Sequence, residues 1–132
     1  MGKIIFFIFI LLSNIAFANW KIDVLEVYDG DTITADVYLP FDIVLRNQKI
    51  RLLYINAPEI KGKGVDEEQK LKGYKAKSHL IGLLKDKDVY LSTDPIKGRE
   101  RDAFGRILGI LTVDSVVINY KMIEDGHAVL FK

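Results

Sequence analysis

The chain has 132 residues with 19 basic and 18 acidic side chains, which is the size of one domain with almost no net charge. This balance excludes a globally basic nucleic-acid-binding protein, so any affinity for a polyanion must come from a local patch. The absence of cysteine excludes disulfides, thiolate zinc sites and a cysteine nucleophile. We therefore expect one domain that is stabilised by its hydrophobic core.

Residues 1–18 have the features of a secretory leader. Lys3 gives a positive start, residues 4–12 are continuously apolar, and Ala16-Phe17-Ala18 matches the small-x-small pattern before a cleavage site. An uncleaved membrane anchor is the alternative, but the apolar segment is shorter than the ~20 residues that span a bilayer. We expect cleavage after Ala18, secretion or export to the periplasm, and a mature domain of residues 19–132 that is not stably inserted in a membrane.

Two strands joined by a tight turn open the predicted domain. Residues 20–28 alternate apolar and polar side chains, which is the period of a half-buried strand, and residues 32–39 have the same character. Asp29-Gly30 lies between them, and this pair is a strong hairpin signal. We predict an antiparallel pair that ends at Pro40, followed by a connection over residues 42–47.

The next predicted strand ends in three chemically different groups. Arg51 precedes four large apolar residues, which are too few for a helix and typical of a buried strand. Asn56, Pro58 and Glu59 follow, and proline both ends a sheet ladder and restricts the residue before it. A cation, a neutral oxygen donor and a carboxylate are thus predicted to lie together, either as a phosphate and metal site or as ordinary surface groups.

The remaining elements complete a small mixed domain. In chain order they are a glycine-rich charged loop, a helix, two strands and a short helix, at residues 61–66, 67–85, 88–92, 107–113 and 117–125. Gly126 is placed as the C-terminal cap of the last helix. The order predicts an α+β, mainly β fold: a five-stranded OB-like Greek-key barrel with one helix between strands 3 and 4 and a short helix after strand 5.

A local positive patch lies between the fourth and fifth predicted strands. Residues 97–106 hold four basic side chains and two acidic ones, although the whole chain is nearly neutral. Arg106 ends this segment in the sequence Asp102-Ala103-Phe104-Gly105-Arg106. For Arg106 taken alone, an ion pair with Asp102 is favoured over a role in binding.

Three short motifs follow one another along the chain: Asp29-Gly30-Asp31-Thr32, Arg51 through Glu59, and Asp102 through Arg106. Each is weak by itself, because Asp-Gly-Asp is common in turns. Together, separated by the predicted strands and one helix, they resemble the staphylococcal nuclease family of thermonuclease-like domains over essentially all of the mature chain. The resemblance implies a calcium-dependent nuclease that acts on DNA, RNA or both.

The resemblance also implies roles for individual residues. Arg51 and Arg106 match the two arginines that bind the phosphate, and their planar guanidinium groups remain charged at neutral pH. Glu59 matches the carboxylate that orients or deprotonates the attacking water. The implied calcium ligands are the Asp31 carboxylate, the Asn56 side chain and the Ala57 backbone carbonyl, with Asp29 in the outer shell.

The sequence departs from the family pattern at three places. Asn56 stands where the family typically has aspartate, which removes one negative charge from the implied calcium site. Phe104 replaces a tyrosine whose hydroxyl often reaches the substrate phosphate, and the sequence stops at Lys132, before the substrate-stacking tyrosines of the staphylococcal enzyme. Stacking on an aromatic ring contributes ~1–3 kcal/mol per base, so weaker binding is expected. The candidates to replace those tyrosines are Tyr54, Tyr74 and Phe131.

Two functions stay open at this point. One is a nuclease, a monomer with nucleic acid as its substrate, that leaves 3′-phosphate ends by analogy with the family. The other is a catalytically inactive barrel that binds nucleic acid or a protein partner through the basic loop, which the three departures favour. The joint presence of Asp31, Arg51, Glu59 and Arg106 favours the nuclease, because a binding module has no evident need for all four.

Overall fold

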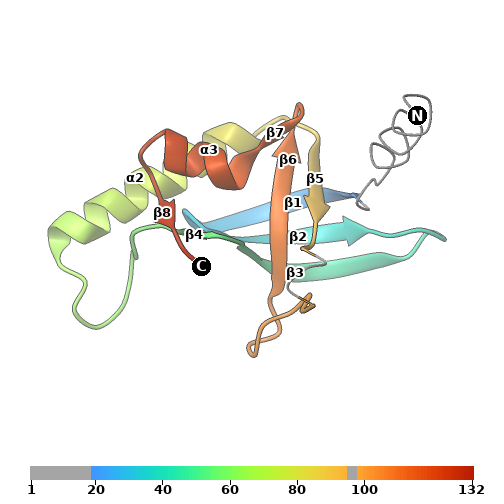
Figure 1. The fold of residues 1–132 in the computed structure, drawn as a ribbon, viewed down its shortest axis with the longest axis horizontal. Helices are drawn as coiled ribbons and strands as arrows, with labels where there is room; N and C mark the ends of the chain where they lie inside the picture. Colours follow the sequence, from blue (N-terminus) through green and yellow to red (C-terminus); the bar gives the residue numbers. More distant parts are fainter. Residues whose placement is uncertain (1–18, 95–97) are drawn as a thin grey trace, which may run out of the picture.

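The computed structural model describes residues 19–94 and 98–132 (Figure 1). Its elements in chain order are β1 (Trp20–Asp29), β2 (Thr32–Tyr38), β3 (Val44–Leu52), β4 (Ile55–Asn56), α2 (Glu67–Leu84), β5 (Val89–Ser92), β6 (Ile107–Val113), β7 (Val116–Val117), α3 (Ile118–Glu124) and β8 (Val129–Leu130). The predicted leader lies outside the described residues and stays a prediction. No helix in the described part of the chain has the length and apolar character needed to cross a membrane.

Five strands close into a barrel. Antiparallel neighbours run in the order β3-β2-β1-β5-β6, and parallel pairing of β3 with β6 closes the ring. The short strand β7 pairs antiparallel with the end of β6, while β4 and β8 form a separate two-stranded sheet beside the barrel (Figure 1). The predicted fold class is confirmed, including the helix between the third and fourth barrel strands and the short helix after the fifth.

The barrel interior and one face of α2 form a continuous apolar core. Residues of β6 alternate between buried and half-buried positions along the whole strand, as expected for a strand with one inward face. Ala76, Leu80 and Leu84 of α2 are buried against this core. α2 begins with a capping box, in which the Asp66 side chain accepts a hydrogen bond from the Gln69 amide at 2.8 Å.

The end of α3 confirms the predicted glycine cap. Gly126 has φ +81°, in the left-handed region. Its amide donates to the Ile123 carbonyl at 3.0 Å, and the His127 amide donates to the Met122 carbonyl at 2.9 Å. This pair of bonds satisfies carbonyls at the helix end and turns the chain back toward β4.

Two boundaries of the third predicted strand were wrong. Residues 42–47 were expected to form a connection, but β3 already starts at Val44, because Asn47 takes φ +52° at a bulge and lets the strand continue beside β2. The strand was also expected to continue past Arg51 to Ile55, but it ends at Leu52. Tyr54 has φ +68°, so the chain turns there and resumes as the separate strand β4.

Asn119 of α3 joins the barrel to the turn that precedes β4. The side chain is 1% exposed, accepts a hydrogen bond from the Leu111 amide at 3.0 Å, and donates to the carbonyls of Leu53 at 2.9 Å and Gly109 at 3.0 Å. Two of these backbone groups lie on β6 and the third lies in the turn after β3, and all three have this amide as a common partner. A polar side chain in the core thus fixes how the turn at Leu53 sits on the barrel.

Replacing Asn119 with alanine should destabilise the protein by about 3 kcal/mol, because three buried backbone groups would lose a partner. Urea unfolding followed by fluorescence would measure the loss. The matched control is Tyr120→Ala at the neighbouring position, where the side chain is half exposed and the expected change is small. Equal stability of the Asn119 variant and the parent would contradict this role.

Candidate active site

The barrel carries an open cleft of about 560 Å³ on the outer side of β1, β2 and β3. Its lining residues are Glu26, Tyr28, Asp29, Asp31, Thr32, Thr34, Lys49, Arg51, Glu59 and Arg106. Four residues proposed from the sequence, Asp31, Arg51, Glu59 and Arg106, therefore meet in one cleft although 75 positions separate the first from the last. Asn56 and Ala57 line a neighbouring hollow beside Gly126.

The turn between β1 and β2 holds two buried carboxylates. Asp29 is 5% exposed and Asp31 is 3% exposed, and the Asp31 amide donates to Asp29 Oδ1 at 3.0 Å. A β-carbon at Gly30 would lie 2.6 Å from Ala57 Cβ and 2.7 Å from Ala76 Cβ. Glycine is required here by the close approach of α2 and the segment after β4, and not by a left-handed backbone.

Negative charge is concentrated at this end of the cleft. Burial, followed by repulsion from the Asp31 carboxylate, raises the pKa of Asp29 to about 7, and Glu59 acts in the same direction. The Asp31 carboxylate is held by the Thr32 hydroxyl at 3.0 Å and by the Ala57 amide at 2.8 Å. Both acids are thus fixed in place by short hydrogen bonds within the protein.

Arg51 is fixed by the turn that ends β3. Its guanidinium donates to the carbonyls of Leu52 at 2.7 Å and Ile55 at 2.9 Å, and Nη2 also donates to Asn56 Oδ1 at 2.6 Å. The same Nη2 lies 3.5 Å from Asp31 Oδ2. Arg51 therefore sits between the acidic turn and β4, in an orientation set by backbone oxygens.

Glu59 is exposed at the mouth of the cleft, and a glycine of α2 supports its backbone. A β-carbon at Gly73 would lie 2.9 Å from the Glu59 carbonyl oxygen and 3.0 Å from the Pro58 carbonyl oxygen. From the sequence alone, Gly73 is only a residue of low helix propensity within the predicted helix. The structure shows that it lets α2 lie directly against the segment that carries Glu59.

Arg106 enters the cleft from the loop before β6. Its Nε donates to Asp102 Oδ2 at 2.7 Å and its amide to Asp102 Oδ1 at 2.9 Å, while the Phe104 amide also donates to Oδ1 at 3.0 Å. Partial burial acts to raise the pKa of Asp102, but these hydrogen bonds outweigh it and hold the pKa below its ordinary value. Arg106 is therefore both an ion-pair partner of Asp102 and a cleft residue.

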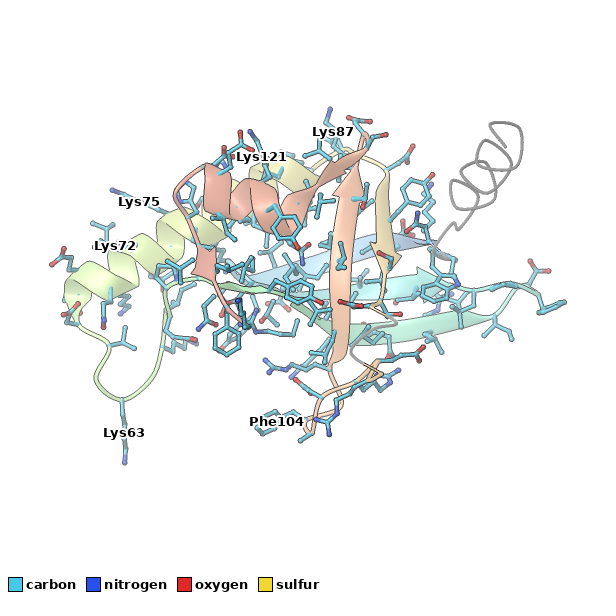
Figure 2. The ribbon with its side chains drawn as sticks, viewed as in Figure 1. Lys63, Lys72, Lys75, Lys87, Phe104 and Lys121 are labelled. Atoms are coloured by element: carbon cyan, nitrogen blue, oxygen red, sulfur yellow. The ribbon has the colours of Figure 1, made fainter. Side chains whose placement is uncertain are left out.

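The aromatic residues are arranged differently from the sequence expectation. Phe104 lies at the outer end of its loop and is 85% exposed, with its ring 5.6 Å from the Arg106 guanidinium carbon (Figure 2). Tyr54, Tyr74 and Phe131 are absent from the cleft lining, and the Tyr54 hydroxyl donates to Asp94. The aromatic side chain that does line the cleft is Tyr28, which is 54% exposed.

The ligand atoms proposed for calcium, on Asp31, Asn56 and Ala57, are all oxygens, which are the ligands that a hard cation prefers. Asp31 Oδ2 and Asn56 Oδ1 both lie near one atom, Arg51 Nη2, at 3.5 and 2.6 Å. Among residues 19–94 and 98–132, no three or more histidine, aspartate or glutamate side chains are grouped to hold a metal ion. With an amide at position 56, the proposed calcium ligands carry one negative charge fewer than they would with aspartate there.

A comparison with protein families gives a match to the model described as staphylococcal nuclease homologue over residues 49–132, more than half of the chain. The chain belongs to the staphylococcal nuclease family. Membership indicates a nuclease-like or nucleic-acid-binding function, with nucleic acid as the ligand. The matched segment includes Arg51, Glu59 and Arg106, whereas Asp29 and Asp31 precede it. A search of curated proteins returned no match.

Lys49 and Tyr28 are cleft residues that the sequence analysis of this staphylococcal nuclease homologue missed. Lys49 stands two residues before Arg51 on β3, and strand alternation places both on one face. The two-residue spacing of Lys49 and Arg51 within a predicted strand could have identified Lys49 from the sequence. Tyr28 directly precedes Asp29 of the acidic turn, so its place beside the site was also visible in the sequence.

Proposed function

We propose that the protein is an exported, calcium-dependent nuclease that hydrolyses phosphodiester bonds in DNA, RNA or both. The observation that carries this proposal is the meeting of Arg51, Arg106, Glu59 and Asp31 in one cleft. Two cations and two acids around one open space are the groups that hydrolysis of a phosphodiester needs. The leader-like residues 1–18 support export to the periplasm or the medium.

The proposed reaction forms a bond from water oxygen to phosphorus and breaks the bond to the 5′ oxygen. Glu59 orients the water and accepts its proton, while Arg51 and Arg106 stabilise the negative charge that grows on the phosphate oxygens. The leaving 5′ oxygen takes up a proton from solvent, with Arg106 close by to stabilise its charge. The products carry a 3′-phosphate and a free 5′-hydroxyl.

Calcium would be held by the Asp31 carboxylate, the Asn56 amide oxygen and the Ala57 carbonyl, with Asp29 behind them. When bound, it would add positive charge next to the phosphate oxygens and help to align the water. The oxygen-only donor set supports this assignment. In the structure Asn56 Oδ1 accepts from Arg51, so Asn56 must turn from the guanidinium or share its oxygen to bind the ion.

Asn56→Asp should bind calcium about ten-fold more tightly than the parent, because a carboxylate replaces a neutral oxygen donor. Isothermal titration of the protein with calcium, without substrate, measures this directly. Gln69→Glu is the matched control, since it adds the same charge at the start of α2 and keeps the capping box. Equal calcium affinity of Asn56→Asp and the parent would remove position 56 from the ligand set.

The decisive test of the function is cleavage by residues 19–132, the part that contains the whole barrel core. Single-stranded DNA and RNA would be incubated with calcium and then with chelator. We expect cleavage with calcium, its loss with chelator, and 3′-phosphate ends. Cleavage that persists with chelator would remove the metal from the mechanism, and no cleavage at any calcium concentration would reject the enzyme.

A binding module without activity is the second candidate. It is supported by the exposed Phe104 in place of tyrosine and by Asn56 in place of aspartate. Thermal unfolding separates the two functions, because calcium at about 100 times its Kd should stabilise a calcium-binding native state by about 2.7 kcal/mol. Nucleic-acid binding without turnover, together with no thermal shift in calcium, would establish the binding module.

A further inference from the structure

Lys49 occupies a defined place next to the two arginines of the cleft. It lies on β3 between Gln48 and the fully buried Ile50, so its side chain projects outward on the same side as Arg51. β3 and β6 run parallel with Ile50 opposite Ile107, so Arg106, the residue just before β6, follows the same register next to Lys49. All three cations line the cleft.

Lys49 differs from both arginines in having no partner among the residues that the structure describes. The Arg51 guanidinium is bound to two carbonyls and Asn56, and Arg106 is bound to Asp102. In residues 19–94 and 98–132, no hydrogen bond or ion pair involves the Lys49 ammonium, and the side chain is exposed. Its charge is therefore free to interact with a ligand in the cleft.

Strand β2 separates Lys49 from the acidic side chain that β1 contributes to the middle of the cleft. Glu26 of β1 is opposite Thr34 of β2, and Thr34 is opposite Lys49, so Glu26 is two strands away, about 9.5 Å across the sheet. Asp29 is the last residue of β1, and Asp31 lies in the turn just before β2. The cleft thus has a row of cations along β3 and the loop before β6, and this row meets the acidic turn at Arg51.

The spacing along β3 fits successive phosphates. Residues two positions apart on a strand are about 6.7 Å apart, which is close to the separation of neighbouring phosphates in an extended single strand. A phosphate held by Arg51 would place the next one along the strand within reach of the Lys49 ammonium. The Lys49 ammonium, at this spacing from Arg51, is therefore placed to bind a second phosphate.

We infer that Lys49 binds the phosphate adjacent to the one that is cleaved, so that the nucleic-acid backbone runs along β3 from Arg51 to Lys49. This inference rests on the proposed nuclease function. It makes the preferred substrate a single strand with at least two consecutive phosphodiesters, and it makes Lys49 a substrate-binding residue that takes no part in the proton transfer.

The test is a double-mutant cycle between Lys49→Gln and a short single-stranded oligonucleotide with one neutral methylphosphonate beside the cleaved bond. Lys49→Gln should raise KM about five-fold for the normal oligonucleotide and should have much less effect on the methylphosphonate substrate. In calcium-free binding measurements, the dependence of log Kd on log salt should fall by about 0.7, the value for one phosphate contact on a single strand. The thermal midpoint should match that of the parent because Lys49 is exposed.

Lys87→Gln is the matched control, because Lys87 lies near the junction of α2 and β5, at the other end of the barrel from Phe104 in the view of Figure 2. It should retain the parent's KM and salt dependence. A parent that binds and cleaves, with equal KM effects of Lys49→Gln on both substrates, would overturn the inference and leave the nuclease intact. A parent that neither binds nor cleaves nucleic acid would overturn both.

Discussion

Glu59→Gln should reduce kcat about 100- to 10,000-fold while the protein remains folded and still binds nucleic acid. Glutamine keeps the size of the side chain and its ability to accept a hydrogen bond, but it cannot take a proton from water. Glu59 is exposed and its backbone is supported by Gly73, so the substitution leaves the packing of α2 unchanged. The loss should therefore appear in kcat, with Kd for an oligonucleotide close to that of the parent.

Steady-state cleavage and fluorescence-anisotropy binding of the same oligonucleotide give the two readouts for Glu59→Gln. Glu67→Gln provides the control, since Glu67 is an exposed acid in the first turn of α2 and lies outside the cleft lining. A Glu59→Gln variant with kcat within a few-fold of the parent would exclude Glu59 as the group that handles the proton. The remaining acids of the cleft, Glu26, Asp29 and Asp31, would then have to be tested in turn.

Arg106→Ala should reduce kcat about 100- to 1,000-fold, which is the usual effect of removing one charged donor from a site that stabilises a transition state. The loop should keep its shape, because Asp102 retains hydrogen bonds from the amides of residues 104 and 106. Arg51 is less suitable for this test, since its guanidinium also binds the carbonyls of Leu52 and Ile55 and its loss would disturb the turn.

Arg99→Ala is the matched control for Arg106→Ala, with the same charge removed from the same loop but at an exposed position outside the cleft lining. Arg106→Lys adds a second comparison. It keeps the charge and loses the planar fork, so its activity should lie between those of the parent and the alanine variant. Equal activity of the Arg99 and Arg106 alanine variants would show that the loop contributes only general positive charge.

Much of the fold was predictable because the local signals agree with one another. Strand-like patterns identified β1 and β2, the mostly apolar segment 107–113 identified β6, the Asp-Gly pair identified the first turn, and Gly126 identified the end of α3. The start of β3 was missed because the bulge at Asn47 interrupts the alternation. The break after Leu52 was missed because four apolar residues read as one strand, whereas Tyr54 takes a left-handed conformation that residue type alone does not predict.

The sequence by itself determined which residue types are available for a phosphodiester site, namely Asp31, Arg51, Glu59 and Arg106, and in what order they occur. Only the tertiary structure decided that they share one cleft, because that depends on pairing between strands far apart in the sequence, above all β3 with β6. It also decided that Asn56 accepts a hydrogen bond from Arg51 and that the Lys49 ammonium lines the cleft without a partner among the described residues. Such facts follow from which groups become neighbours after folding, and no local pattern in the chain specifies them.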